Sequence, residues 1–187
     1  MAVPRLGPPS AGTLRGRRVL LGRPDARLVF VWIILFQGFH ELEHVVQVLQ
    51  RFFLGIPQGN GIVGQAVDVE PLHFLYNLVL LASLGELWWA AELRHRRGRD
   101  WGAVAFLLIA FATLAQSWHM LEHVVKLLQY LETGKNGTPG ILGGTFNLPL
   151  LHLAYNTLVY APVLAAFLAA GIPCALLRAR EAGAAGR

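Results

Sequence analysis

The sequence contains a single cysteine, Cys174, among its 187 residues. One thiol excludes an intramolecular disulfide framework, and it also excludes a metal site built from several thiolates. We expect Cys174 to be a small buried residue of the last hydrophobic run.

Charged residues are also scarce. Asp, Glu, Lys and Arg make up 14% of the chain, whereas soluble domains carry about 25%. Hydrophobic residues make up 55%, and they form long runs at 28–50, 72–93, 102–128 and 150–177. As a helix, each run is long enough to cross about 30 Å of hydrocarbon, and continuous runs without alternation argue against a β-barrel. We therefore expect an all-α integral membrane protein, a four-transmembrane-helix bundle.

The positive charge is unevenly distributed along the chain. Most of the 16 Lys and Arg residues precede the first run, separate the second from the third, or follow the fourth. The positive-inside rule then predicts that both termini and the middle connection are cytoplasmic, in a bacterial plasma membrane. We expect a disordered basic tail at 1–27, a basic cytoplasmic loop at 94–101 and a second tail at 179–187. Because topology accounts for the basic segments, we expect no nucleic-acid partner. No small-residue cleavage site follows the first run, so that helix is expected to be retained.

The first run contains the segment GFHELEHVVQ. Here His40, Glu41 and His44 fit the zinc-protease pattern H-E-x-x-H. A second copy of the segment reads QSWHMLEHVV, and in this copy Met120 stands at the position of Glu41. The shared pattern is therefore H-x-x-E-H, which also occurs in inverted zinc proteases. Two copies, each with a further histidine downstream, do not match a protease pattern.

The duplication extends beyond this motif. The same shift along the chain takes GIVG to GILG and LHFLYN to LHLAYN. Chance matches among apolar residues would not align His, Glu, Tyr and Asn. We predict two parallel helical-hairpin repeats, 28–93 and 102–178, related by a pseudo-twofold axis along the membrane normal.

The duplicated polar residues predict a metal site near the extracytoplasmic side. Positions i, i+3 and i+4 of a helix share one face, and the second helix of each hairpin begins at the depth of the H-x-x-E-H motif. A carboxylate in a membrane span costs roughly 2.5–3.5 kcal/mol, and metal coordination offsets such a cost. Zn, Fe, Mn and Cu suit these donors, in two separate sites or in one dinuclear centre, which we favour. The predicted ligands are His40, Glu43, His44, His73, His119, Glu122, His123 and His152.

Two alternatives use the same residues. Polar side chains can simply join membrane helices, at about 1 kcal/mol each, although this rarely requires so many titratable groups. Bis-histidine haem would use four of the histidines and leave the glutamates without a role, so metal ions are favoured. Tyr76 and Tyr155 are candidates for proton or electron transfer. Residues expected to orient the ligands or to join helices are Gln37, Asn77, Gln116 and Asn156.

Three functional classes fit this pattern. We favour a membrane metalloenzyme, an oxidoreductase or hydrolase that acts on a lipid or other apolar substrate through metal activation of dioxygen or water. A metal-ion binding or transport protein would need a polar path, for which Glu86 is the only deep candidate. A non-catalytic subunit or assembly factor of a membrane complex is the third. Asp68 and Glu70 are expected in a solvated outer loop, where they could serve metal access.

Overall fold

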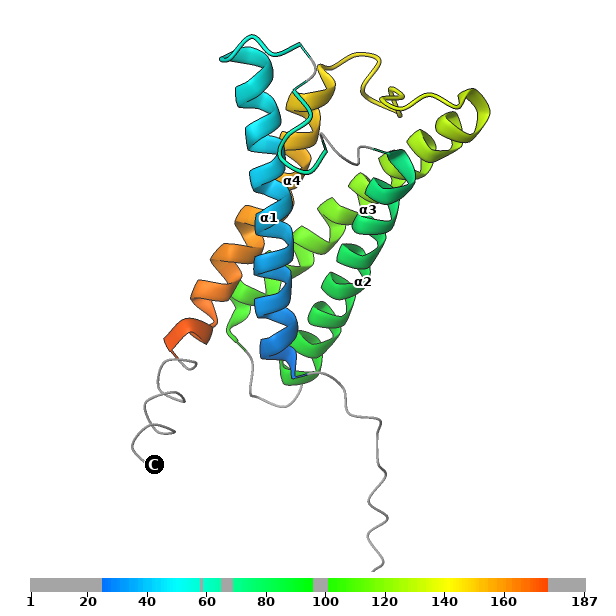
Figure 1. The fold of residues 1–187 in the computed structure, drawn as a ribbon. Coiled ribbons are helices and arrows are strands. Elements are labelled where there is room, and N and C mark those ends of the chain that lie inside the picture. The colour runs from blue at the N-terminus through cyan, green and yellow to red at the C-terminus, as the bar shows by residue number, and fades with distance from the viewer. Residues whose placement is uncertain (1–24, 58, 65–68, 96–100, 175–187) are drawn as a thin grey trace, which may run out of the picture.

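The computed structural model describes residues 25–57, 59–64, 69–95 and 101–174 (Figure 1). In these ranges the chain forms long α-helices and no strand. The helices are α1 (Ala26–Phe52), α2 (Glu70–His95), α3 (Ala103–Thr133) and α4 (Leu148–Ala169). All four are long and apolar enough to cross a membrane, which confirms the expected helical class.

The three basic segments predicted from charge fall almost entirely outside the described residues. These are the tails at 1–27 and 179–187 and the middle loop at 94–101. Their predicted cytoplasmic location and disorder stay predictions.

Local sequence sets where two of the helices begin. The Asp25 carboxylate accepts a hydrogen bond from the backbone N–H of Arg27 (3.0 Å) and caps α1. The side chain of Asn147 accepts one from the backbone N–H of Leu150 and caps α4. Such caps satisfy backbone donors that have no partner within the helix.

Glycines set where α3 and α4 end. α3 runs past its predicted end to Thr133 and stops at Gly134, which adopts φ +68°. α4 ends at Ala169, earlier than its apolar run suggested, because Gly171 adopts φ +65°. Glycine reaches this left-handed conformation without steric cost and commonly ends helices. Cys174 therefore lies beyond α4, and it is exposed, so its prediction as a buried residue of the last span is wrong.

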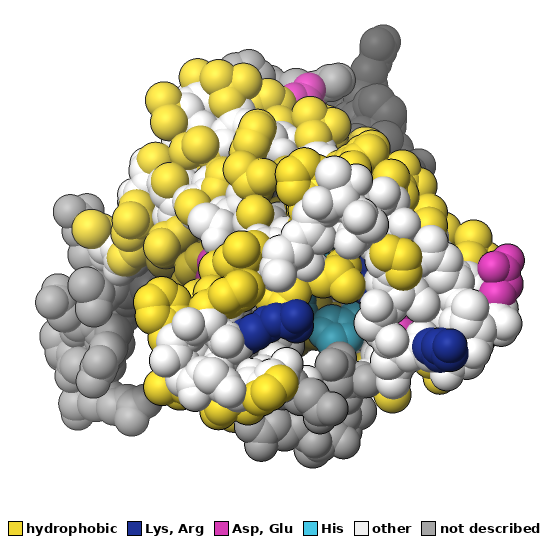
Figure 2. Space-filling view, turned by 90° about the horizontal axis from the view of Figure 1, so that it is seen from above, with side chains coloured by type: hydrophobic (Ala, Val, Ile, Leu, Met, Phe, Trp, Pro, Cys, Tyr) yellow, Lys and Arg dark blue, Asp and Glu magenta, His cyan; other side chains and the backbone are white. Residues whose placement is uncertain are grey.

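In the bundle, α1 packs mainly against α4, α2 packs mainly against α3, and α3 also packs against α4 (Figure 1). Exposed apolar side chains such as Leu35, Leu107 and Leu158 lie on the outer faces, and hydrophobic side chains are widespread in Figure 2. A helix surrounded by lipid requires such a surface.

The two ends of the bundle differ in polarity. We call the end with the connections 53–69 and 134–147 the loop end, and the end where α1 begins and α4 finishes the terminal end. The interior toward the terminal end is apolar, with fully buried Phe30, Ile33, Leu80, Leu84, Ile109, Val159 and Val163. Toward the loop end the buried side chains are polar, and these form the candidate site.

Candidate metal centre

Histidines from all four helices lie together in the bundle toward the loop end. Ring centroids of His44 and His152 are 5.7 Å apart, and those of His73 and His123 are 6.1 Å apart. The predicted ligands of the two hairpins therefore meet across the bundle. We call the six side chains the histidine cluster: His40 and His44 on α1, His73 on α2, His119 and His123 on α3, and His152 on α4.

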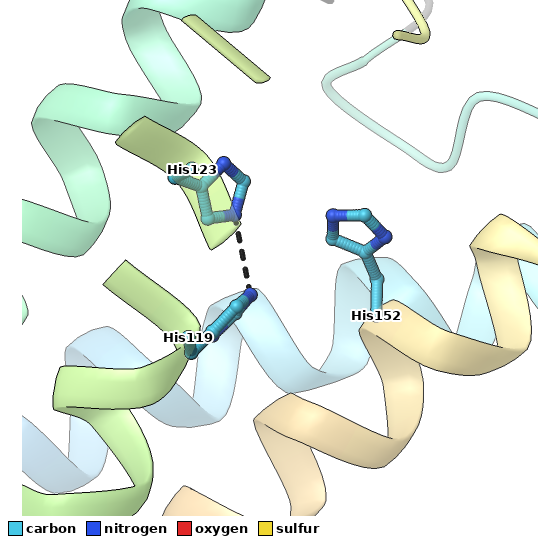
Figure 3. Close-up of side chains that lie close together, drawn as sticks. All are labelled: His119, His123 and His152. Atoms are coloured by element: carbon cyan, nitrogen blue, oxygen red, sulfur yellow. Dashed lines mark hydrogen bonds between the residues drawn. The ribbon is translucent and has the colours of Figure 1, made fainter. Parts of the chain in front are cut away.

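His119, His123 and His152 form a compact group within this cluster (Figure 3). One ligand nitrogen from each lies within 4.8 Å of the other two, and all three side chains are buried. α3 presents two of them one turn apart, and α4 places the third beside them. These three residues lie close enough to bind one metal ion.

The closest nitrogen atoms have the spacing of two ligands on one ion. The Nε2 atoms of His119 and His123 are hydrogen-bonded at 3.2 Å (Figure 3), and those of His40 and His44 are also hydrogen-bonded at 3.2 Å. Two nitrogens bound to tetrahedral Zn²⁺ at about 2.0–2.1 Å would lie about 3.3–3.4 Å apart. Each half of the chain thus presents a pair of imidazoles spaced for a shared ion.

Hydrogen bonds on Nδ1, the ring nitrogen opposite Nε2, orient two imidazoles of the histidine cluster. Nδ1 of His44 donates to Gln47 Oε1 (2.7 Å), and Nδ1 of His152 donates to the backbone oxygen of Leu148 (3.0 Å). Both acceptors are oxygens without a hydrogen, so the ring proton lies on Nδ1. Nε2 then keeps the lone pair that a metal ion needs.

A carboxylate expected in a solvated loop orients His123. Nδ1 of His123 donates to Glu70 Oε1 (3.0 Å), and Glu70 Oε2 lies 3.4 Å from Lys126 Nζ. Glu70 is the first residue of α2 and only 5% exposed, so its prediction as a solvated loop residue is wrong. Its position three residues before His73, on the same helix face, was the signal that could have located it. Asp68 lies outside the described residues.

Glu43 and Glu122, two of the predicted metal ligands, accept hydrogen bonds from the connections that follow their helices. Glu43 accepts hydrogen bonds from three consecutive backbone N–H groups, residues 62–64, at 2.8–3.0 Å. Glu122 accepts them from residues 141–142, at 3.0 and 3.2 Å. We call these contacts the glutamate latches. Both carboxylates are buried, and they tie the two connections to the helices that carry the histidines.

Glycines allow the connections to approach the latches. Gly61 has φ +84° and Gly140 has φ +70°, and a Cβ at either position would overlap the carboxylate of its latch glutamate. Their backbone N–H groups donate to the side-chain oxygens of Gln50 (2.9 Å) and Gln129 (2.8 Å). The G-I-x-G strings therefore serve close packing of backbone on carboxylate.

Four buried amides form a layer next to the cluster. Gln37 Nε2 donates to Asn156 Oδ1 (2.8 Å), and Gln116 Nε2 donates to Asn77 Oδ1 (2.9 Å). Each asparagine Nδ2 also donates to the backbone oxygen of the histidine one turn earlier, at 2.9 Å. The layer therefore joins α1 to α4 and α2 to α3, and it binds histidine backbone groups, not the imidazoles.

The two tyrosines contact the cluster through their rings. Tyr76 stacks on His40 with centroids 4.2 Å apart, and Tyr155 stacks on His119 at 4.9 Å. The Tyr76 hydroxyl donates to a backbone oxygen of α1, and the Tyr155 hydroxyl accepts from Trp118 Nε1 (3.1 Å). In this arrangement the rings fix the imidazole planes, while the hydroxyls bond to other groups.

Glu41, the carboxylate of the H-E-x-x-H string, lies away from the cluster. Its Oε1 accepts a hydrogen bond from the hydroxyl of Thr157 on α4 (2.6 Å). This position agrees with the argument from the second copy against a zinc-protease site.

A polar cavity of about 190 Å³ opens onto the cluster at the loop end. Gln47, Arg51, Glu70 and Lys126 line it together with four of the histidines. Figure 2, seen from the loop end, shows a histidine side chain in this hollow beside a basic one. Small polar molecules can therefore reach the imidazoles from this end.

The donor set and the cavity together define the available chemistry. Neutral imidazoles bind transition ions, and the cavity leaves room for a further small ligand beside them. No family model matches the chain, and comparisons with curated proteins and with solved structures find no significant match.

Proposed function

We propose that the chain is an integral membrane metalloenzyme, an oxidoreductase or a hydrolase, that acts on a lipid or other apolar substrate at the extracytoplasmic side. The observation that carries the proposal is the 3.2 Å spacing of Nε2 atoms in both halves of one buried cluster. Positive residues flanking the terminal end favour a cytoplasmic location for that end, so the polar cavity would open outward.

Six imidazoles support a dinuclear centre. His119, His123 and His152 can bind one ion. The α1 pair and His73 occupy the corresponding positions of the other sequence copy, with the ring centroid of His73 6.0 and 6.4 Å from those of the α1 pair, and we propose that they hold the second ion. Imidazole suits Zn, Fe and Cu, whereas Mn prefers oxygen donors. The carboxylates of the two latch glutamates, which could supply such donors, are bonded to backbone groups. The polar cavity, at about 190 Å³, is smaller than the roughly 300–1,000 Å³ of ordinary ligand pockets, which argues against haem.

Matching interactions support a pseudo-twofold relation between the two hairpins. The amide pairs, the glutamate latches and the tyrosine–histidine stacks each occur twice, at equivalent positions of the two sequence copies. The halves differ at the polar cavity. Gln47 on α1 corresponds to Lys126 on α3, and Glu70 on α2 corresponds to Pro149 on α4. The two ions would therefore have different surroundings.

The metal ions would supply Lewis-acid activation of water or, if redox-active, of dioxygen. The chain contributes orientation and charge. Nδ1 contacts hold the imidazoles of His44, His123 and His152 in place. Glu70 keeps the ring proton of His123 on Nδ1, and its charge is balanced by Lys126. The glutamate latches keep the connections against the helices that carry the site.

A role in transport is less well supported. Among the described residues, the interior beyond the amide layer is apolar toward the terminal end. Glu86 lines a groove between α1 and α2 with Leu28 and Trp32, and thus offers no polar path through the centre of the bundle.

The test of the proposal is elemental analysis of detergent-purified protein. We expect about two ions per chain, as a dinuclear centre requires, and a loss of metal in both His44→Ala and His123→Ala. His95→Ala, which changes the seventh histidine at the other end of α2, is the matched control. Metal content that neither cluster substitution alters would reject the centre.

Enzymatic function needs a second measurement. Metal-loaded and chelator-treated protein are incubated with lipid extract in air, and the products are compared by mass spectrometry. A product formed only by loaded protein supports catalysis, whereas stable co-purification with other subunits and no product supports the assembly role.

A further inference from the structure

A second, apolar cavity of about 110 Å³ lies between α1 and α2 beside the histidine cluster. We call it the lateral cavity. Its apolar lining comes from Phe39, Val63, Leu72 and Tyr76, and it also reaches His40, Glu43, Gln47, Gly64 and His73. This cavity differs from the polar one in chemistry, although both contact the cluster.

The lateral cavity lies on the part of the surface that a bilayer would surround. Phe39 is 50% exposed and Leu72 is 45% exposed, and both belong to helices apolar enough to span a membrane. Since α1 packs mainly against α4 and α2 mainly against α3, the α1–α2 seam is the less closely packed one. An apolar group could approach His40 through this seam without crossing the polar cavity.

The carboxylate of Glu43 does not disfavour the binding of an apolar group in the lateral cavity. Its oxygens accept hydrogen bonds from the backbone N–H groups of residues 62–64. A carboxylate bonded in this way has its hydrogen-bonding capacity largely satisfied by the protein. The imidazoles at the inner end of the cavity are therefore the groups that an apolar occupant would meet.

The other hairpin is packed differently at the equivalent seam. Trp118 stands at the position of Phe39, and its Nε1 donates to the hydroxyl of Tyr155 across the α3–α4 seam (3.1 Å). The larger indole ring thus bridges the two helices there, whereas the smaller Phe39 ring leaves a gap. The chain itself therefore suggests a substitution that would fill the lateral cavity.

We propose that the lateral cavity binds an alkyl segment of a lipid from the extracytoplasmic leaflet, at the edge of the histidine cluster. This inference rests on the proposed function and names the substrate class for the same site. A cavity of about 150 Å³ can hold a benzene molecule, so 110 Å³ suits a short alkyl segment and not a whole chain. Gln47 and His73 line both cavities, so the polar part of the same lipid would lie toward the polar cavity.

The test uses the full chain in phosphatidylcholine nanodiscs with a palmitic acid probe that carries a diazirine near its methyl end. After illumination, labelled residues are mapped by peptide mass spectrometry. We expect labelling enriched at Phe39 and Leu72 and their neighbours, and at least a fivefold loss of that labelling in Phe39→Trp. Leu72→Trp fills the cavity from the other helix and should act in the same way, whereas Trp118→Phe is the matched control and should leave the α1–α2 labelling unchanged.

Two results would overturn the proposal: equal labelling of the α1–α2 and α3–α4 faces in the wild type, or labelling that persists in a folded cavity-filling variant. If neither variant folds, the comparison of labelling on the α1–α2 and α3–α4 faces of the wild type is the test. Metal content is measured on the same samples. Selective labelling of protein without metal would contradict the proposed metalloenzyme but leave the lipid site intact. Metal-loaded protein without selective labelling would contradict the lipid site but leave the proposed metalloenzyme intact.

Discussion

The side chains of the H-x-x-E-H motif play two distinct roles. Its histidines enter the cluster, whereas its glutamate turns to the backbone of the connection that follows the helix. Spacing on a helix face brings all three side chains to one side of the helix, but it does not determine which of them reaches the centre. The backbone donors of the connections decide this, because a buried carboxylate needs hydrogen-bond partners.

Glu122→Gln tests the latch role at this scale. Hydrogen bonds to a charged group contribute about 1.5–3 kcal/mol, so the neutral side chain should hold the connection 134–147 less firmly. We expect several-fold faster proteolysis in this connection and unchanged metal content. Glu132→Gln, an exposed change on the same helix, is the control. A loss of metal in Glu122→Gln with the connection still protected would make Glu122 a ligand.

Glu70→Gln tests the orientation of His123. Loss of a carboxylate that holds a ligating imidazole typically lowers metal affinity about 10–100-fold, and the change also leaves Lys126 without its ion-pair partner. We expect a drop of this size in competition titrations with a chelator, while helical content by circular dichroism stays the same. Wild-type affinity in this variant would show that Glu70 does not support the site.

Among the helices, the amide layer provides paired contacts between α1 and α4 and between α2 and α3. A buried polar group left without a partner costs about 1–3 kcal/mol, whereas replacement of both partners by apolar groups can be nearly neutral. Both amide pairs are fully buried, so water does not compete for these contacts. The layer therefore fixes how the two hairpins meet.

A double-mutant cycle on Gln37 and Asn156 measures this contact. Gln37→Leu and Asn156→Leu should each lower stability by about 1–3 kcal/mol, and the double variant should be less destabilised than the sum of the two. Unfolding in mixed detergent, followed by circular dichroism, gives the values. Strict additivity would show that the two amides do not depend on each other.

Much of the helical architecture could be predicted from hydropathy, and the convergence of six histidines could be predicted from helical spacing and the duplication. The ends of α3 and α4 could not, because they depend on left-handed glycines inside or just after apolar runs. Glu70 was missed because helix α2 begins two residues before the run of apolar residues that predicted it. The latch role of Glu43 was missed because its partners are backbone groups, which no side-chain pattern identifies.

Across the whole molecule, polarity is divided along the bundle axis. The polar cavity, the histidine cluster and the latches lie toward the loop end, and the apolar core lies toward the terminal end. In a membrane, such a division would open the histidine cluster to water on one side only. Which side this is depends on the orientation proposed from the positive residues.

The single cysteine makes that orientation measurable. Cys174 is exposed and lies at the terminal end, so a membrane-impermeant maleimide should label it only after the membrane is permeabilised. In a Cys174→Ser background, Lys135→Cys places a thiol at an exposed position of the loop end, and this variant should react in intact cells. The two variants serve as controls for each other, because expression and reagent are the same. Labelling of Cys174 but not of Lys135→Cys in intact cells would reverse the topology and place the histidine cluster on the cytoplasmic side, where a substrate from the outer leaflet could not reach it.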